Sequence, residues 1–319
     1  MQCAGRLLIL MAVARPKSAA QPSGLINAFK PQGISSRRVV DHVQRLVRPA
    51  KAGHAGTLDP LASGVLVVCV GQATRLIEYV QRSPKQYRGT FLLGRRSDTE
   101  DIEGQVEELD SPPVPAVQQL EAALANFVGE IQQRPPAYSA LKIEGKRAYD
   151  LARRGEQVEL KPRPVTIYDL KLLAYAYPLF QLEITCSGGT YVRSLGRDIA
   201  ESLGTAAIMS ALERTAVGHF KVEDAVPLDD LTADTWRERL LPATAAVADL
   251  PTVSLGPDEL QRLAHGHPLD AALASTLQLE PDQEVAAIYG PHTKQPGELA
   301  AVLALRGDQL KVVRNFAAQ

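Results

Sequence analysis

"GHAGTLDPLASGVLVVCVG", residues 53–71, places a single acidic side chain, Asp59, in a glycine-rich turn directly before an uncharged run. The run from Gly64 to Gly71 predicts a buried strand, because it is short, rich in valine and bounded by glycines. The simplest role for Asp59 is an Asp-Pro turn that starts this strand through local hydrogen bonds. A carboxylate in such a loop is also what nucleophilic or acid–base catalysis requires, so the stretch alone leaves the function open.

The stretch "SSRRVVDHVQRLVRP", residues 35–49, predicts a helix with Ser35 or Ser36 as its N-cap and Pro49 as its stop. At roughly 100° per residue its valines and leucine share one face, and its arginines gather on the opposite face. The arginines are Arg37, Arg38, Arg45 and Arg48. A basic face is typical of any solvated helix, but the scarcity of acidic neighbours favours a surface that binds phosphates.

Other segments follow the same two periodicities. "YRGTFLLG" (87–94) and the alternating "FQLEITC" (180–186) predict strands, "AVQQLEAALANFVGEI" (116–131) has helical spacing, and "SGGTYVRSLGRDIAESLG" (187–204) predicts a turn followed by a helix. These elements alternate without a regular βαβ period, so the expected class is α+β with a central mixed or antiparallel sheet.

A boundary is expected near residues 242–252, around two prolines. Beyond it, three short apolar stretches separated by Gly, Pro and Asp predict a small β domain. They are "EVAAIYG" (284–290), "LAAVLALRG" (299–307) and "LKVVRNF" (310–316).

Composition excludes several classes of protein. The 319 residues are 45% hydrophobic, which suits a folded chain, yet no apolar run approaches the roughly 20 residues of a membrane-spanning helix. The three cysteines, Cys3, Cys69 and Cys186, are too few and too scattered for a disulfide framework. Without a Cys or His pair at metal-ligand spacing either, we expect a cytoplasmic protein with no metal site.

The net charge of −1 hides an asymmetry. Residues 225–319 hold 13 acidic and 7 basic side chains, a net charge of −6, which leaves +5 on residues 1–224. Within the larger part, residues 134–163 hold eight basic and four acidic side chains with tyrosines between them. This composition is typical of a segment that faces RNA.

The N-terminal residues have the rough outline of a secretory signal, an early Arg followed by a short apolar stretch. Pro16, Pro22 and the Ala/Ser content favour a disordered extension over residues 1–22, or a true start at Met11.

Several polar residues are ambiguous on their own. Arg193, in a second glycine-rich motif, is the best candidate to pair with Asp59, and a neighbouring arginine would keep that carboxylate ionised. His54 is more typical of a packing or hydrogen-bonding residue than of a general base. Tyr87 is more typical of an aromatic residue in the core than of a ring that stacks on a nucleobase. The acidic stretch "SDTEDIEG" (97–104) lacks the spacing of a calcium loop, so we expect a solvated loop there.

Taken in order, the motifs resemble those of the pseudouridine synthases, specifically the branch that modifies the T-loop uridine of tRNA. The similarity spans roughly residues 24–220 in "KPQGISS", "AGHAGTLDPLASGVL", "KQYRG", "SDTEDIEG", "PPAYSALKIEGKRAYDLARRG", "RPVTIYDL", "CSGGTYVRSLGRDIAESLG" and "LERTAVGHF". One departure is Phe29, which occupies a position where the family usually has an acid. We expect only a local packing change from it.

The resemblance assigns roles to residues that the pattern alone leaves open. It implies Asp59 as the nucleophile, Arg193 as its ion-pair partner, and Tyr87 stacked on the flipped uracil. Tyr191 and Leu212 would line the base pocket, and His54 would position the substrate. The implied RNA surface comprises Arg37, Arg45, Lys142, Lys146, Arg147 and Arg153.

The implied organisation is a pseudouridine synthase domain at 23–248, with an RNA-contacting insertion at 129–155, and a PUA-like RNA-binding β domain at 249–319. The expected partner is the T stem-loop of tRNA, bound by a monomer that requires no cofactor. A non-catalytic tRNA-binding or tRNA-folding protein on the same scaffold is the alternative. An Asp-dependent hydrolase is remote, because no second carboxylate stands at a recognisable site.

Overall fold

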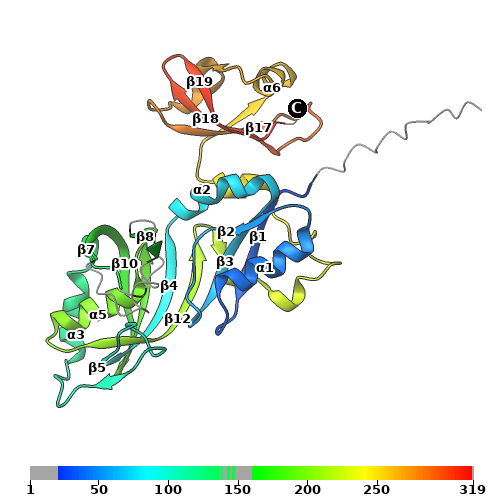
Figure 1. Cartoon of the computed structure of the whole chain (residues 1–319). Coiled ribbons are helices and arrows are strands. Elements are labelled where there is room, and N and C mark those ends of the chain that lie inside the picture. The colour runs from blue at the N-terminus through cyan, green and yellow to red at the C-terminus, as the bar shows by residue number, and fades with distance from the viewer. Residues whose placement is uncertain (1–20, 137, 139–141, 144–145, 148–159, 318–319) are drawn as a thin grey trace, which may run out of the picture.

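The computed structural model describes residues 21–136, 138, 142–143, 146–147 and 160–317. Nearly all of the expected extension, and Arg153, therefore lie outside the described residues. Two large sheets organise the rest, a ten-stranded central sheet and a five-stranded sheet near the C-terminus (Figure 1). The expected α+β class with a C-terminal β domain is confirmed.

The central sheet has the order β14-β1-β3-β12-β4-β11-β10-β7, with β2 beside β3 and β13 beside β12. The strand bounds are Val226–Pro227 (β14), Gly24–Lys30 (β1), Ala62–Val70 (β3), Ala207–Val217 (β12), Lys85–Leu93 (β4), Leu179–Cys186 (β11), Arg163–Ala176 (β10), Gly129–Gln133 (β7), Ala52–His54 (β2) and Phe220–Lys221 (β13). Only β14–β1 and β3–β12 are parallel among these described pairs, so the sheet is mixed as expected.

The strands predicted from "GVLVVCVG" and "FQLEITC" are β3 and β11. In β11 the four alternating apolar residues, Phe180, Leu182, Ile184 and Cys186, are fully buried. In β3 nearly every residue is buried, because this strand lies between β1 and β12 with apolar clusters on both faces.

Helix α1 (Ser36–Val47) covers the β1–β3 half of the sheet. The Ser35 hydroxyl accepts a hydrogen bond from the Arg38 N–H and caps the helix, which ends just before Pro49. Val39, Val43 and Val47 pack into the core, so the predicted apolar face is confirmed.

Two further helices cover the other half, α3 (Val117–Ala125) and α5 (Val192–Ser202). The helical spacing predicts a helix up to residue 131, but α3 ends at Ala125, six residues earlier. Gly129 adopts a φ of +101°, and Gly129–Gln133 then pair with β10 as β7. Val128, placed on the apolar face by the periodicity, is 48% exposed.

The smaller elements are β5 (Arg95–Arg96), β6 (Glu107–Glu108), β8 (Lys142–Ile143), β9 (Lys146–Arg147), η1 (Gly71–Leu76), α2 (Ile77–Arg82), η2 (Val222–Asp224), η3 (Leu228–Asp230) and η4 (Ala243–Val247). Strands β8 and β9 pair as a separate hairpin within the predicted RNA-facing segment. No helix in the described part of the chain is long and apolar enough to cross a membrane.

The C-terminal β domain contains β15 (Thr252–Leu255), α6 (Pro257–Ala264), β16 (Leu269–Asp270), η5 (Ala271–Leu277), β17 (Glu284–Tyr289), β18 (Leu299–Arg306) and β19 (Gln309–Asn315). The three apolar stretches expected to be strands are β17, β18 and β19, and they enclose a hydrophobic core of their own. In Figure 1 this domain lies beyond α2. Arg75 of η1 donates to the Asn315 carbonyl at 2.7 Å across the contact.

Strands β3 and β12 join the two halves of the central sheet through a short parallel pairing, which we call the seam. It comprises three residue pairs, Ala62–Gly64 of β3 with Leu212–Arg214 of β12. Gly64 has a φ of +103°, and a Cβ there would collide with the backbone of Arg214. The backbones can approach this closely only because residue 64 lacks a side chain.

We predict that Gly64→Ala lowers the free energy of unfolding by far more than the cost of a positive φ alone. A non-glycine residue in a left-handed conformation costs roughly 1–2 kcal/mol, and the collision with Arg214 adds to it. Gly204→Ala is the matched control. Gly204 also has a positive φ, +74°, but no other atom lies within 4 Å of the position that a Cβ would occupy. Denaturant unfolding of the two variants measures the difference, and equal losses would contradict the close approach at the seam.

Candidate active site

A cavity of about 770 Å³ opens at the seam. Five of the residues that the sequence singles out line it together: Asp59, Tyr87, Tyr191, Arg193 and Leu212. They come from the β2–β3 loop, from β4, from the start of α5 and from β12, so only the folded chain brings them together. The volume is in the range of small-molecule sites.

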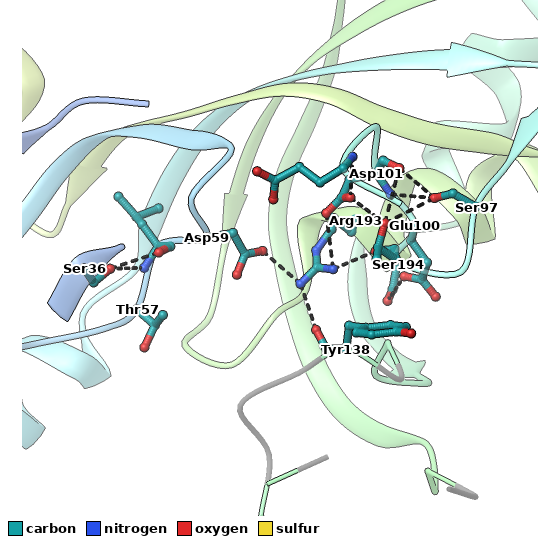
Figure 2. Close-up of polar contacts among 12 residues, drawn as sticks. Ser36, Thr57, Asp59, Ser97, Glu100, Asp101, Tyr138, Arg193 and Ser194 are labelled. Atoms are coloured by element: carbon teal, nitrogen blue, oxygen red, sulfur yellow. Dashed lines mark hydrogen bonds and ion pairs between the residues drawn. The ribbon is translucent and has the colours of Figure 1, made fainter. Parts of the chain in front are cut away.

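Asp59 and Arg193 form an ion pair, with 2.9 Å between Oδ2 and Nη2. The Asp59 side chain is 38% exposed and the Arg193 side chain only 7%. The pair, drawn in Figure 2, therefore combines a partly exposed carboxylate with a buried counter-ion.

Other groups fix the Arg193 guanidinium in place. It donates to the carbonyls of Thr99 at 2.6 Å and Tyr138 at 3.1 Å, and its Nη1 lies 3.4 Å from Oδ2 of Asp101. Because its donors are directed at several fixed acceptors, the guanidinium cannot rotate freely, and this orients the Asp59 carboxylate.

The acidic loop at 97–104 supplies two of these acceptors. The expectation of a solvated loop is wrong for its central acids, Glu100 and Asp101, but Asp98 and Glu103 are exposed. Asp101 is 3% exposed, and Glu100 pairs with Arg197 and accepts from the Ser194 hydroxyl at 2.7 Å. Burial raises the pKa of Glu100, and Arg197 opposes this effect. Arg197 of α5 thus binds the loop through Glu100. The loop in turn binds Arg193 of the same helix through Thr99 and Asp101.

The backbone of the Asp59 loop is braced from the N-terminal side. The Ser36 hydroxyl donates to the Leu58 carbonyl at 2.9 Å and accepts from the Leu58 N–H at 2.8 Å. The Gly33 N–H and the Lys30 ammonium both donate to the Pro60 carbonyl, at 2.8 Å and 3.4 Å. The residues on both sides of Asp59 are therefore fixed to α1 and to the segment before it.

Lys30 is fully buried and directs its ammonium at backbone carbonyls, those of Pro31 at 2.9 Å and Ile34 at 2.8 Å besides Pro60. Burial lowers the pKa of Lys30 to about 8, and the nearby Asp59 carboxylate opposes this shift. A buried ammonium is costly unless it is hydrogen-bonded, so this lysine ties the loop down at some cost in stability.

Tyr87 lies in the cavity wall on β4 and is 9% exposed. Burial raises the pKa of its phenol, and the positive charge of Arg214 beside it opposes this shift. Leu212, two residues before Arg214 on β12, supplies an apolar wall. Tyr191 lies under the Arg163 guanidinium, 4.9 Å from its ring centroid, which fixes the ring plane.

His54 lies on β2 and is not one of the side chains that line the cavity. Its Nδ1 accepts from the Gly56 N–H at 3.3 Å. Burial lowers the pKa of His54, and the positive charge of Arg214 lowers it further. A neutral ring that supports the loop through Gly56 fits these contacts, and the substrate contact implied by the resemblance stays a prediction.

Of the predicted RNA surface, Arg37 and Arg45 lie exposed on α1, and Arg37 pairs with Asp41 at 2.8 Å. Lys142, Lys146 and Arg147 lie on the β8–β9 hairpin, where only the backbone is described. Among the described residues, no group of three or more His, Cys, Asp and Glu side chains is arranged to hold a metal ion.

Two family profiles match the chain. The first, described as TruB family pseudouridylate synthase (N terminal domain), matches residues 44–192, and the second, tRNA pseudouridylate synthase B C-terminal domain, matches residues 193–274.

Relatives are similar over most of the chain. A tRNA pseudouridine synthase B from Syntrophotalea carbinolica is 41% identical over 84% of this chain and 89% of its own length. One from Caulobacter sp. is 39% identical over 95% of this chain and 99% of its own length. A chain in the crystal structure of a Cbf5-Nop10-Gar1 complex superposes with a TM-score of 0.71 at 27% identity, covering 92% of this chain and 84% of that chain.

The lowered pKa of Lys30 predicts a pH effect on stability. Between about pH 8 and pH 10.5, Lys30 is protonated to a greater extent in the unfolded chain than in the folded protein. The contribution of Lys30 to the free energy of unfolding therefore rises with pH in this range. Lys30→Met removes that contribution, and we expect the wild type to gain stability relative to the variant across this window. Denaturant unfolding at several pH values measures the difference. Parallel profiles of the two proteins would contradict the shift.

Proposed function

Because the chain belongs to the TruB family of pseudouridylate synthases and is an isomerase that acts on uridine in tRNA, we propose that its target is the T-loop uridine and that Asp59 is the nucleophile. The observation that carries the proposal is the ion pair of Asp59 with the buried Arg193 in a cavity large enough to admit a nucleoside. A protein that only bound RNA would have no need of an exposed carboxylate there, because it would repel the phosphates.

The reaction breaks the glycosidic bond between C1′ and N1, turns the uracil, and forms a bond between C1′ and C5. A covalent bond to a carboxylate divides this path into easier steps and holds one fragment while the base turns. In the proposed assignment Asp59 attacks, Arg193 orients it, and Tyr87 stacks on the uracil near the carbon that loses its proton. Tyr191 and Leu212 keep the detached base in the cavity.

The target uridine has to leave the loop stack before Asp59 can reach it. Flipping costs a few kcal/mol, and stacking on an aromatic ring returns about 1–3 kcal/mol per base. Tyr87 and Tyr191 both line the cavity and supply this surface. The fixed plane of Tyr191 under Arg163 supports such a stacking role, since a ring already held in place loses little freedom on binding.

For the RNA surface we propose the exposed face of α1 and the β8–β9 region. The Ser36 contact with Leu58 places the start of α1 at the Asp59 loop, so Arg37 lies close to the cavity. The charge of Arg37 reaches His54, whose pKa it helps to lower, after burial and Arg214. Phosphates flanking a flipped uridine would therefore meet Arg37 first.

The division into a catalytic domain at 23–248 and a PUA-like domain at 249–319 is part of the same proposal. It is supported by the separate hydrophobic core of the C-terminal sheet. We also propose a cytoplasmic monomer. Burial raises the pKa of the free thiols of Cys69 and Cys186 to about 12 and about 11, so both are unreactive, as suits a reducing compartment.

We predict that Asp59→Asn abolishes release of tritium from tRNA labelled at C5 of uridine, because the amide cannot form the covalent bond. Binding of tRNA by the variant should remain close to that of the wild type. If the wild type releases no label but binds tRNA, the protein is a non-catalytic tRNA-binding protein. Near-normal turnover by Asp59→Asn would instead reject Asp59 as the nucleophile.

Reversing the charge on α1 with Arg37→Glu and Arg45→Glu should weaken tRNA binding and flatten its dependence on salt, because fewer phosphates are neutralised. Lys171→Glu is the control, since Lys171 is also exposed and paired with an aspartate, but lies on β10. Filter binding at several salt concentrations gives both quantities. An unchanged salt slope in the α1 variant, or an equal change in the control, would make these arginines ordinary surface residues.

A further inference from the structure

Arg214 of β12 is a buried cation that the proposed chemistry does not use. It is 2% exposed, and no carboxylate in the described part of the chain lies within ion-pair distance of it. Its hydrogen-bond acceptors are backbone carbonyls. A buried charge without a counter-ion is expensive, so its presence at the seam requires an explanation beyond packing.

The Arg214 guanidinium makes contacts on both sides of the seam. On the β3 side its Nε donates to the Val65 carbonyl at 2.8 Å, and its two terminal nitrogens donate to the carbonyls of Thr57 at 3.4 Å and Gly56 at 3.2 Å. On the β4 side it lies directly across from Tyr87 in the antiparallel pairing, and its charge opposes the rise that burial causes in the pKa of the phenol. One planar group thus binds the loop that carries Asp59 and lies beside the ring that faces it.

The strand register explains how one side chain reaches both. Arg214 pairs with Gly64 in the parallel seam and with Tyr87 in the antiparallel β12–β4 pairing. It therefore stands at the point where three strands meet. Gly64 leaves the space in which the two backbones come close.

We propose that Arg214 is a positioning residue that fixes the distance between the Asp59 loop and Tyr87 across the seam. This inference rests on the proposed function. Without Arg214, the two halves of the sheet would still pair, but the nucleophile and the stacking ring would be held by separate halves. Misplacement by about 1 Å is enough to cost 100-fold in rate, because the reacting atoms have to meet in one geometry.

An arginine suits this task better than other residues. A methionine of similar length would fill the same space without removing a charge from water, and would serve a purely structural seam at least as well. A lysine keeps the charge but concentrates its donors on one nitrogen. Only the planar guanidinium offers donors in several directions at once, as the three separate carbonyls require.

The test uses Arg214→Lys and Arg214→Met in the full-length enzyme, measured by single-turnover tritium release at saturating enzyme. We expect Arg214→Met to slow the reaction about 100-fold and Arg214→Lys about tenfold, with tRNA affinity within about threefold of the wild type. A loss in rate with binding intact distinguishes positioning of the reacting groups from damage to the RNA surface. Val43→Ala, in the fully buried face of α1, is the control for lost stability alone and should keep the wild-type rate wherever it is folded.

A double-mutant cycle with Tyr87→Phe tests the link directly. If Arg214 acts in part through the phenol, Arg214→Lys should cost less in a Tyr87→Phe background than in the wild type. Rates of both Arg214 variants within about twofold of the wild type, or losses confined to tRNA affinity, would overturn the proposal. If Arg214→Met does not fold, the single-turnover rate of Arg214→Lys alone decides the test. The activity of the wild type is measured first. A wild type without synthase activity would contradict the proposed function, which is a different outcome from an unimportant Arg214.

Discussion

The parallel pairing of β3 with β12 is the constraint on which the rest of the structure depends. It spans only three residue pairs, yet it joins the two halves of the central sheet. Asp59 lies three residues before the first pair, and Leu212 and Arg214 lie within it. The residues that shape the cavity are therefore also those that hold the sheet together. The close approach at Gly64 is possible only without a side chain, so the site and the fold share one steric requirement.

Charge at the site is arranged so that Arg193 never lacks a partner. The buried guanidinium faces Asp59 at 2.9 Å and Asp101 at 3.4 Å. In the proposed reaction Asp59 loses its charge when it forms a covalent bond, and a buried cation left alone would then oppose that step. Asp101, 3% exposed and away from the cavity, takes no part in that step and stays beside Arg193. The buried Asp101 thus makes it possible for the more exposed Asp59 to react.

Local pattern was enough to predict α1, with its cap and stop, and the buried strands β3 and β11, because each depends on neighbours in the sequence. The burial of Glu100 and Asp101 in the acidic loop was not predicted, since their partners come from α5, and Arg193 lies 94 positions from Thr99. Arg214 was missed for the same reason: composition places arginines at surfaces, and only the register of three strands buries this one. Family resemblance named the cavity residues, but not the groups that position them.

Helix α2 connects the cavity to the C-terminal domain. Glu78 and Arg82 line the cavity, and the same side chains pair with Arg314 of β19 at 2.6 Å and Glu284 of β17 at 3.2 Å. Apolar residues of both domains form one buried cluster around this contact. Ion pairs this exposed add little stability, so the apolar cluster holds the domains together and the charges set their orientation. If the C-terminal domain binds RNA, as proposed, that RNA would meet the cavity at a fixed distance, and a rigid stem-loop can use such spacing to present a single uridine.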